Sequence, residues 1–383
     1  MLPGPRVLTR RRDVLKTLAA LPLAGCATGG GAPARRHYTP SGRPLRRAQV
    51  SPDRVVRVVT GLRPFRPSGF VVAAEPFGDK LLIHNYGHGG GGITLSWGTS
   101  TLALELAMQS EHRQAAVLGC GAVGLASARL LQRHGWDVTI YAAALPPATT
   151  SNIAGAQWSP ASVFDRDAVS ARHLDELGVA ARHAYREFQY LVGPDYGVRW
   201  ISNYFLSDAP AELTDMRLRY PDVFPELGPL GPGEHPFPAP HVMHFDTMFI
   251  EPPVYLPALM RDVRGAGGRI VVREFRAAQE LATLTEPVVV NCTGLGSRAL
   301  FGDEELVPVK GQLVVLKPQA ELEYLMIYDG RYMFPRTDGV LLGGSFDRGD
   351  WSLEPDPALT ADILADHAEI FAAMDDPWAL PWQ

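Results

Sequence analysis

Two arginines near residue 65 combine a residue type and a spacing suited to binding an anion. Arg63 and Arg66 are each followed by a proline, in the segment Gly-Leu-Arg-Pro-Phe-Arg-Pro that begins at Gly61. Proline restricts its own backbone and that of the residue before it, so each arginine stands on a stiff stretch of chain. A guanidinium group held in this way can bind a carboxylate through two parallel hydrogen bonds. Two ordinary surface arginines on an edge strand are the alternative interpretation.

A glycine-rich stretch, Leu81–Ser100, is the second candidate site. An apolar run ends in His84-Asn85-Tyr86, and glycine occupies five of the six positions from 87 to 92. Because glycine has no Cβ atom, such a backbone can lie close to a flat ligand. A strand, a glycine loop and a helix in this order also leave N–H groups free to bind an anion. A flexible linker seldom lies between a buried strand and an amphipathic helix, so the pattern favours a ligand-binding loop.

A second glycine motif lies within residues 115–142. A buried apolar run leads into Gly119-x-Gly121-x-x-Gly124, and an amphipathic helix and the strand Asp137–Tyr141 follow. This is the dinucleotide fingerprint in its required context, with the pyrophosphate at the helix N-terminus. One element is missing, because the second strand usually ends in an acid that holds the adenosine ribose. Here Ala142-Ala143-Ala144 follow Tyr141, so the sequence names no residue for the ribose.

The remaining pattern predicts strands and helices in alternation, which favours a doubly wound sheet. Residues 216–245 are rich in proline and are expected to be irregular. The expected strands are Phe70–Glu75 and Lys80–Tyr86, which form a hairpin, and Arg269–Phe275 and Pro287–Cys292. The expected helices are Thr99–Gln109, Asp165–Leu191, Glu251–Gly267 and Ala358–Met374.

Composition bounds the class of protein. A chain of 383 residues with 20% charged residues is long enough for two domains with cores. A formal charge of −5 lacks the positive excess that would indicate a nucleic-acid-binding protein. We expect no metal site, because no helix or strand gathers His235, His241 and His244, and glycines oppose the helix that a metal pair at His84 and His88 would need.

The N-terminus reads as a targeting segment. Arg10-Arg11-Arg12 opens a pattern close to the twin-arginine export signal, and an apolar run too short to span a bilayer follows from Val14 to Ala24. It ends in Leu23-Ala24-Gly25-Cys26, which resembles a bacterial lipoprotein cleavage box. We therefore expect an exported, periplasmic protein whose only link to the membrane is a lipid on Cys26. Cys120 and Cys292 are expected to be buried structural thiols.

Several segments together resemble the D-amino-acid oxidase (DAO) family, whose members use FAD. The main one is His84-Asn85-Tyr86-Gly87-His88-Gly89-Gly90, with Gly92, Thr94 and Trp97-Gly98 behind it. Asn291-Cys292-Thr293-Gly294 and Lys310-Gly311-Gln312 resemble further family segments. The resemblance implies an α/β (α+β) chain of two domains, a Rossmann-like FAD-binding domain and a mixed-sheet substrate domain.

The resemblance also implies which residues bind FAD and substrate. Arg63 and Tyr332 would hold the substrate carboxylate, Tyr328 would lie over the substrate, and the Gly90 carbonyl would accept from the amine. Gly91 stands where family members carry a bulkier aromatic residue, and Arg336 could favour an acidic side chain or face solvent. The implied FAD contacts are Gly119, Gly121, Ala122, Val123, Gly124, Thr149, Thr150, Ser151, Ala154, Gly155, Gln157, Trp158, Thr293, Gly294, Gly89, Gly91, Gly92, Ile93 and Thr94.

The order of these segments is permuted relative to the family, which begins with the nucleotide motif and ends with the His-Asn-Tyr segment. A circular permutation needs the old termini to be close, with 110–114 as the joining loop, and predicts that Met374 lies near Ser51. The expected parts are a signal peptide (1–26), a linker (27–54), an FAD-binding domain (70–160 and 248–315) and a substrate-binding domain (55–69, 161–247 and 316–374).

The implied reaction is FAD-dependent oxidative deamination of a D-amino acid to a 2-keto acid, ammonia and, with dioxygen, hydrogen peroxide. A flavin dehydrogenase that passes electrons to a membrane acceptor is the first alternative. A lipoprotein that binds flavin or an amino acid without turnover is the second. A nicotinamide enzyme has only the shared glycine motif in its favour.

Overall fold

The computed structural model describes residues 44–210 and 219–375, which fall in one compact unit. Two β-sheets organise these residues, as the expected α/β architecture requires. The targeting segment, including Arg10–Arg12 and Cys26, lies outside the described residues. Within the described ranges, every helix is too short or too polar to cross a membrane.

The first sheet is mainly parallel and has six strands among the described residues. Its central parallel strands carry Val, Ile, Leu and Ala side chains that are almost fully buried, as expected for a sheet covered on both faces, whereas the edge strand Arg269–Val272 leaves Val271 and Val272 exposed. The outermost strand β2 runs antiparallel to β3 and forms the expected hairpin with it. In spatial order the strands are β2 (Val71–Phe77), β3 (Lys80–Tyr86), β10 (Val288–Asn291), β4 (Gln114–Leu118), β5 (Asp137–Ala142) and β9 (Arg269–Val272).

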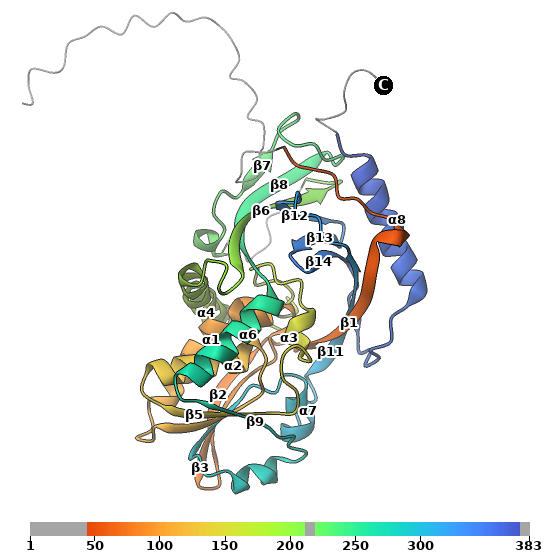
Figure 1. Ribbon diagram of the computed structural model, residues 1–383. Helices are drawn as coiled ribbons and strands as arrows, with labels where there is room; N and C mark the ends of the chain where they lie inside the picture. Colours follow the sequence, from red (N-terminus) through yellow and green to blue (C-terminus); the bar gives the residue numbers. More distant parts are fainter. Residues whose placement is uncertain (1–43, 211–218, 376–383) are drawn as a thin grey trace, which may run out of the picture. The chain divides into compact units, whose positions relative to one another are not determined.

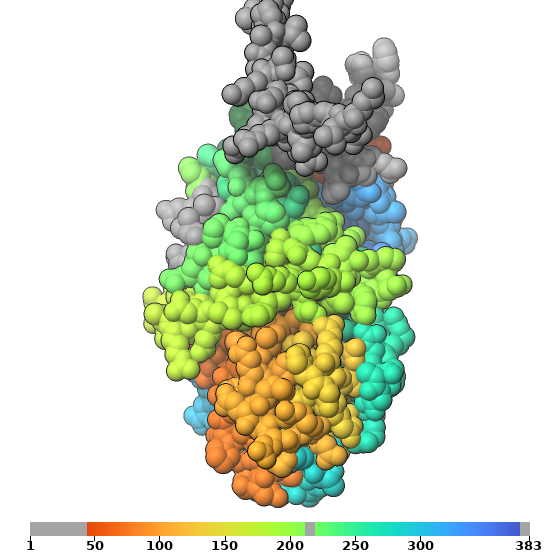
Figure 2. Space-filling model, turned by 90° about the vertical axis from the view of Figure 1, so that its left-hand side faces the viewer, coloured from red at the N-terminus to blue at the C-terminus, as the bar shows by residue number. Residues whose placement is uncertain are grey.

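Helices cover the two faces of this sheet unequally (Figure 1). One face packs against α1 (Gly92–Ala107), α2 (Ala122–Arg133) and α6 (Pro252–Gly265), with α4 (Ala171–Tyr190) packed on α1. In Figure 2 the orange and yellow surface of residues near 100–150 meets the yellow-green surface of residues near 170–200. The other face packs against the short η5 (Ala278–Thr283) and α7 (Gly296–Phe301).

The second sheet is mixed and has nine strands among the described residues. The pair β12–β6 is parallel and its other pairs are antiparallel. Helix α8 (Pro357–Ala372) packs on β11, β13 and β14. The strands are β1 (Val55–Phe65), β11 (Val307–Leu316), β14 (Gly339–Gly343), β13 (Arg331–Arg336), β12 (Tyr324–Tyr328), β6 (Val198–Ser207), β8 (His241–Ile250) and β7 (Gly228–Leu230), with β15 (Asp347–Arg348) on β11. Short helical turns remain at η2 (Pro52–Arg54), η3 (Gly89–Gly91), α3 (Thr150–Ile153) and η4 (Pro221–Val223).

Some boundaries differ from the sequence-based expectation. Helix α1 begins at Gly92 rather than Thr99, so the last glycine of the loop is already helical. Helix α4 begins at Ala171 rather than Asp165, because the Ser170 side chain accepts a hydrogen bond from the His173 N–H and caps it. The described part of 216–245 is not wholly irregular, since it contains β7 and the start of β8. Strand β11 belongs to the second sheet, whereas most of it was expected in the FAD-binding domain.

The described end of the expected linker is part of the fold. Leu45 and Ala48 are buried in the core beneath α8, and the Tyr324 hydroxyl donates to the Arg46 carbonyl at 2.7 Å. Arg47 donates a hydrogen bond to the carbonyl of Met374. The chain segment that leads into β1 therefore meets the end of α8, and residues from 44 onward are not a free tether.

Candidate active site

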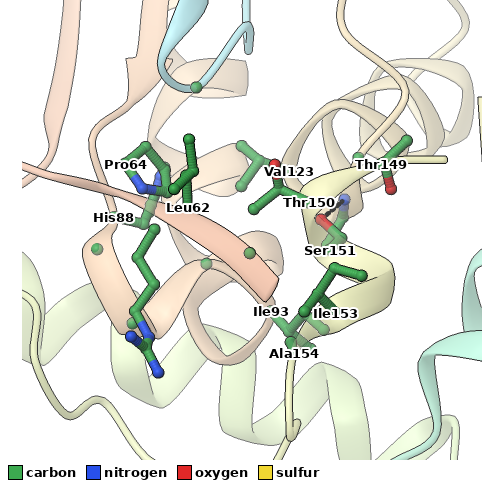
Figure 3. A pocket seen from close by; sticks show the side chains of 18 of the residues that line it. Leu62, Pro64, His88, Ile93, Val123, Thr149, Thr150, Ser151, Ile153 and Ala154 are labelled. Carbon is green, nitrogen blue, oxygen red and sulfur yellow. Dashed lines mark hydrogen bonds between the residues drawn. The ribbon is translucent and has the colours of Figure 1, made fainter. Parts of the chain in front are cut away.

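One cavity of about 1290 Å³ gathers most of the residues that the sequence singles out. The carboxyl ends of β4 and β5 and the N-termini of α1 and α2 form one part of its wall. Strands β1, β11 and β13 of the second sheet contribute the other part. Figure 3 shows these two sides, with Leu62, Pro64 and His88 on one and Thr149, Thr150 and Ser151 on the other.

The turn between β4 and α2 is shaped by its glycines. Gly119 has a φ of 105°, and a Cβ atom there would lie 2.5 Å from the Cys292 carbonyl oxygen. A Cβ atom at Gly124 would overlap the carbonyl of Gly119, so Gly124 lies outside the cavity and allows α2 to pack on the turn. Gly121 is the N-cap of α2 and provides no side chain to occupy the first N–H groups of the helix.

This helix N-terminus fits a pyrophosphate group. The Ala122 N–H donates to Ser151 Oγ at 3.0 Å, which brings the Thr149–Ser151 segment over the start of α2 (Figure 3). Thr149, Thr150, Ala122 and Val123 line the cavity beside it. Backbone donors, hydroxyl groups and a helix dipole are together the donor set that binds phosphate.

The N-terminus of α1 opens on another part of the same cavity. Gly92, Ile93 and Thr94 line it, and the N-cap residue Gly91 makes no side-chain capping bond. The Thr94 hydroxyl donates to the Ser159 carbonyl at 3.1 Å, which joins α1 to the opposite wall. The first N–H groups of α1 thus face the cavity, a position that suits a ligand with negative charge.

Side chains of the His-Asn-Tyr segment hold the loop in place. Asn85 donates from Nδ2 to the hydroxyls of Ser100 on α1 and Ser127 on α2, each at 3.2 Å. His88 is buried, and its Nε2 lies 2.8 Å from the hydroxyl of Thr99. Burial, followed by the charge of a neighbouring histidine, lowers the pKa of His88 to about 3. The loop is therefore tied to both helices by neutral groups.

Tyr86 and Arg66 belong to one polar cluster beside the loop. The Tyr86 hydroxyl donates to Asp303 at 2.9 Å, and Arg66 donates to Asp303 at 2.8 Å and to Glu305 at 2.6 Å. Arg66 also donates to the Gly69 carbonyl at 2.9 Å. Its guanidinium group is fully engaged within the protein, which leaves Arg63 as the candidate carboxylate ligand of the pair.

Arg63 and Tyr332 come together on the cavity wall. Arg63 donates to the Ser345 carbonyl at 3.3 Å, and no carboxylate among the described residues lies within 4.0 Å of its guanidinium group. Burial raises the pKa of Tyr332, while the charge and hydrogen bonding of Arg63 act in the opposite direction. A half-buried arginine and a neutral tyrosine hydroxyl thus face one space, a suitable arrangement for binding an anion.

The register of the second sheet extends this site. Phe205 pairs with Ile327, Ile327 with Tyr332, and Tyr332 with Gly343. Paired residues point to the same face, and Phe205, Ile327 and Tyr332 all line the cavity. The surface beyond Tyr332 is therefore apolar.

Tyr328 does not share this position, contrary to the sequence-based expectation. It precedes the turn between β12 and β13 and pairs with Arg331, so it faces away from Ile327 and Tyr332. Its hydroxyl donates to Asp208 at 2.5 Å, and this bond raises its pKa to about 12. Tyr328 lies outside the cavity.

The other expected site residues also divide into some that line the cavity and some that do not. Trp158 is fully buried in the core beside Tyr185, and Gly91 packs toward Val163, so neither lines the cavity. Arg336 is buried and forms a bidentate pair with Asp338, so it neither faces solvent nor reaches the cavity. The expected residues that do line the cavity are Arg63, Tyr332, Gly90, Gly89, Gly92, Ile93, Thr94, Gly119, Gly121, Ala122, Val123, Thr149, Thr150, Ser151, Ala154, Gly155, Gln157, Thr293 and Gly294.

Two buried polar atoms on the wall lack a partner within the described structure. They are Oδ1 of Asn85 and Nε2 of Gln157, and both residues line the cavity. A buried polar atom without a partner is costly, so such atoms mark places where a ligand completes the hydrogen bonding. With the glycine turn and the two helix N-termini, they fit a dinucleotide that runs from α2 to α1.

Sequence reasoning missed the cavity residues that follow β9 and those before α4. Residues 273–276 line the cavity beside the end of β5, and residues 159–164 line it beside α1. Cys120 and Cys292 also line it; neither is in a disulfide, and burial raises the pKa of each to about 12. Nothing in the composition of these segments marks them, because they reach the cavity through the packing of distant strands.

Comparison with known proteins agrees with this geometry. The DAO family, described as FAD dependent oxidoreductase, matches residues 114–382. A D-amino-acid oxidase of Rubrobacter xylanophilus is 32% identical over 265 residues, which cover 66% of this chain and 75% of that protein. A D-aspartate oxidase of Homo sapiens is 33% identical over 261 residues, or 65% and 73% of the two chains.

A solved structure gives the same fold at lower identity. Glycine oxidase from Geobacillus kaustophilus aligns with a TM-score of 0.52 and 19% identity, over 68% of this chain and 78% of that chain. The match to the family extends over most of the chain and includes the glycine turn, residues 149–157 and Tyr332. The chain belongs to the DAO family of FAD-dependent oxidoreductases, and FAD is its cofactor.

Proposed function

We propose that this enzyme oxidatively deaminates a D-amino acid. The observation that carries the proposal is the pairing of Arg63 with Tyr332 at the wall of the FAD cavity, without a carboxylate of the protein within reach among the described residues. An arginine and a hydroxyl on one cavity wall provide the charge and the donors that a substrate carboxylate needs. The names of the two curated relatives support the same substrate class.

Each residue has a role in this proposal. Arg63 binds and orients the carboxylate, Tyr332 donates a hydrogen bond to it, and the carbonyl of Gly90 accepts from the substrate amine. FAD, when bound, supplies the two-electron acceptor for the Cα–H bond. The apolar surface beside Tyr332 helps to fix the orientation of the substrate, which matters more here than a protein base. The N–H groups at the start of α1 stabilise negative charge that develops on the ligand beside them.

The products follow from the bonds involved. Loss of two electrons and two protons converts the amine to an imine, and water then releases a 2-keto acid and ammonia. Transfer of the electrons to dioxygen gives hydrogen peroxide. Because Phe205 and Ile327 line the surface beyond Tyr332, we propose a substrate with an apolar side chain.

An anaerobic titration of the flavin absorbance tests the reaction. D-amino acids with apolar and acidic side chains, their L-forms and glycine are added in turn, and air is then admitted. We expect bleaching by apolar D-forms and rapid recovery in air. Bleaching with slow recovery would indicate a dehydrogenase with another acceptor. Intact flavin absorbance with every substrate would contradict oxidative deamination and favour a non-catalytic binding protein.

We also propose that the chain is a circular permutation of the family order. The family match begins at residue 114, where β4 begins, although β3 and α1 precede it and pack in the same part of the fold. The contact between Arg47 and Met374 supports closeness of the new ends. A chain that begins at residue 114 and carries residues 44–113 behind residue 374 on a short linker should give an active enzyme in the family order. An insoluble or flavin-free product would argue against the permutation.

Export and lipid anchoring remain a separate proposal. The supporting features are the arginine run at residues 10–12 and Cys26, which lie outside the described residues. Cell fractionation of a Cys26→Ala variant tests the anchor, with release from the membrane fraction as the expected result. Unchanged membrane association would contradict a lipid on Cys26.

A further inference from the structure

The end of the cavity beside β5 lacks the acid that usually holds the adenosine ribose. The parallel strands β4 and β5 place the start of α2 and the Ala142–Ala144 segment at the same edge of the sheet. In this fold class a carboxylate that follows the second strand accepts hydrogen bonds from the ribose hydroxyls. All three residues at that position are alanines, which offer no acceptor in their side chains.

The neighbouring strand brings a carboxylate to this place. Strands β5 and β9 are parallel with Ala142 opposite Val272, and the Arg273 N–H donates to the Ala142 carbonyl at 3.0 Å. Continuing this register places Glu274 beside the alanine segment. Among the described residues that line the cavity, Glu274 is the one carboxylate.

The residues on either side of Glu274 are held by other contacts. Arg273 donates to the Thr283 hydroxyl at 2.7 Å, and its guanidinium group lies 4.5 Å from the centre of the Phe275 ring. Phe275 meets Tyr141 edge to face, with ring centres 6.0 Å apart. Arg276 is an ion-pair partner of Glu274, but their closest charged atoms are 3.7 Å apart, longer than a hydrogen bond. The Glu274 carboxylate therefore keeps the capacity to accept hydrogen bonds from a ligand.

We propose that Glu274 is the cofactor-binding residue that accepts the hydroxyl groups of the adenosine ribose of FAD. It replaces the missing acid of β5 from the adjacent strand β9. A carboxylate here accepts from two neighbouring hydroxyls, whereas it would repel an additional phosphate at the same position. The inference concerns FAD binding and does not depend on which substrate the enzyme oxidises.

Binding of FAD to the apoprotein tests the assignment directly. Flavin fluorescence is titrated for the unaltered enzyme and for Glu274→Ala, with FAD and with an FAD analogue that lacks both adenosine ribose hydroxyls. We expect Glu274→Ala to weaken FAD binding by about tenfold, the loss typical of a hydrogen bond to a charged group. Binding of the analogue should be weak and equal in the two proteins.

Glu111→Ala is the matched control, because it removes an exposed carboxylate that does not line the cavity. Glu111→Ala should bind FAD as the unaltered enzyme does. Equal losses in Glu274→Ala and Glu111→Ala would show a general effect of lost negative charge and would overturn the proposal. So would an equal loss of FAD and analogue affinity in Glu274→Ala, or no loss at all. Thermal melting of each apoprotein confirms that the exposed substitutions leave the fold intact.

Discussion

The backbone of Gly311 lies directly beneath the guanidinium group of Arg63, so closely that a Cβ atom at Gly311 would be 2.5 Å from Nη1 of Arg63. Gly311 stands on β11, opposite Gly61 of β1, and the two strands together form the support of the arginine. Gly343 on β14 has the same relation to the ring of Tyr332, which a Cβ atom would overlap. Two glycines of the second sheet therefore leave space for Arg63 and Tyr332, the two side chains proposed to bind the substrate carboxylate.

The substitution Gly311→Ala should move Arg63 without removing its charge. We expect KM for the amino acid to rise about tenfold, because a displaced guanidinium group loses its hydrogen bonds to the carboxylate. Steady-state kinetics measure the change, and flavin absorbance confirms that FAD remains bound. Gly228→Ala is the control, since a Cβ atom there meets nothing within 4 Å. An unchanged KM in Gly311→Ala would show that the arginine is not held by this contact.

Arg63 and Arg66 should give opposite results when each is replaced by alanine. Arg63→Ala should lower kcat/KM by about 10- to 100-fold and leave the melting temperature nearly unchanged, because its guanidinium group faces the cavity. Arg66→Ala leaves Asp303 and Glu305 without their partner and should cost about 2–3 kcal/mol of folding free energy. Kinetics and thermal melting of both variants separate the two roles. Equal loss of stability in both would contradict the assignment of Arg63 as a substrate ligand.

Tyr332→Phe and Tyr328→Phe form a second matched pair. Both remove one hydroxyl, but that of Tyr332 faces the cavity and that of Tyr328 donates to Asp208 outside it. We expect Tyr332→Phe to raise KM by about fivefold to tenfold, the effect of one lost hydrogen bond, and Tyr328→Phe to leave kinetics unchanged. A substrate analogue without the carboxylate should be insensitive to both changes. Similar kinetic losses in the two variants would indicate that Tyr328 also contacts the substrate.

The difference between the two tyrosines shows which parts of the site could be predicted from the sequence. Local signals were sufficient for the hairpin β2–β3 and for the turn before α2, because each depends on glycine and on a short run of apolar residues. The side on which Tyr328 and Tyr332 lie depends on the register of β12 with β13, and the spacing of the two residues does not contain it. Glu274 likewise reaches the cavity through the pairing of β5 with β9.

The start of α1 was missed for a related reason. Glycine is a poor helix former, so Gly92 and Gly98 argue against a helix by local propensity. A Cβ atom at Gly98 would overlap the backbone of Ala180, which shows that α1 and α4 pack closely at this point. Tertiary packing therefore outweighs propensity here, and the helix extends back to Gly92, where its N-terminus meets the cavity.

Burial of His88 should make the enzyme sensitive to acid. His88 stacks on Phe70, its Nε2 contacts Thr99, and His173 lies near enough to lower its pKa further after the larger effect of burial. The unfolded chain binds a proton at His88 near the ordinary pKa of 6.5, whereas the folded protein does so near 3. Between these two pH values the unfolded state binds more protons than the folded state. The contribution of His88 to the unfolding free energy is therefore fully present above pH 6.5 and is lost as the pH falls towards 3.

Replacement of His88 by glutamine should remove this part of the pH dependence. Below pH 6.5, the unfolding free energy should fall with decreasing pH more steeply in the unaltered enzyme than in His88→Gln. The two slopes should differ by up to about 1.4 kcal/mol per pH unit. Denaturant unfolding at several pH values, followed by intrinsic fluorescence, measures the two slopes. His112→Gln, at an exposed position, should keep the slope of the unaltered enzyme. Parallel slopes for His88→Gln and the unaltered enzyme would mean that His88 is not held neutral in the fold and that the loop before α1 tolerates its charge.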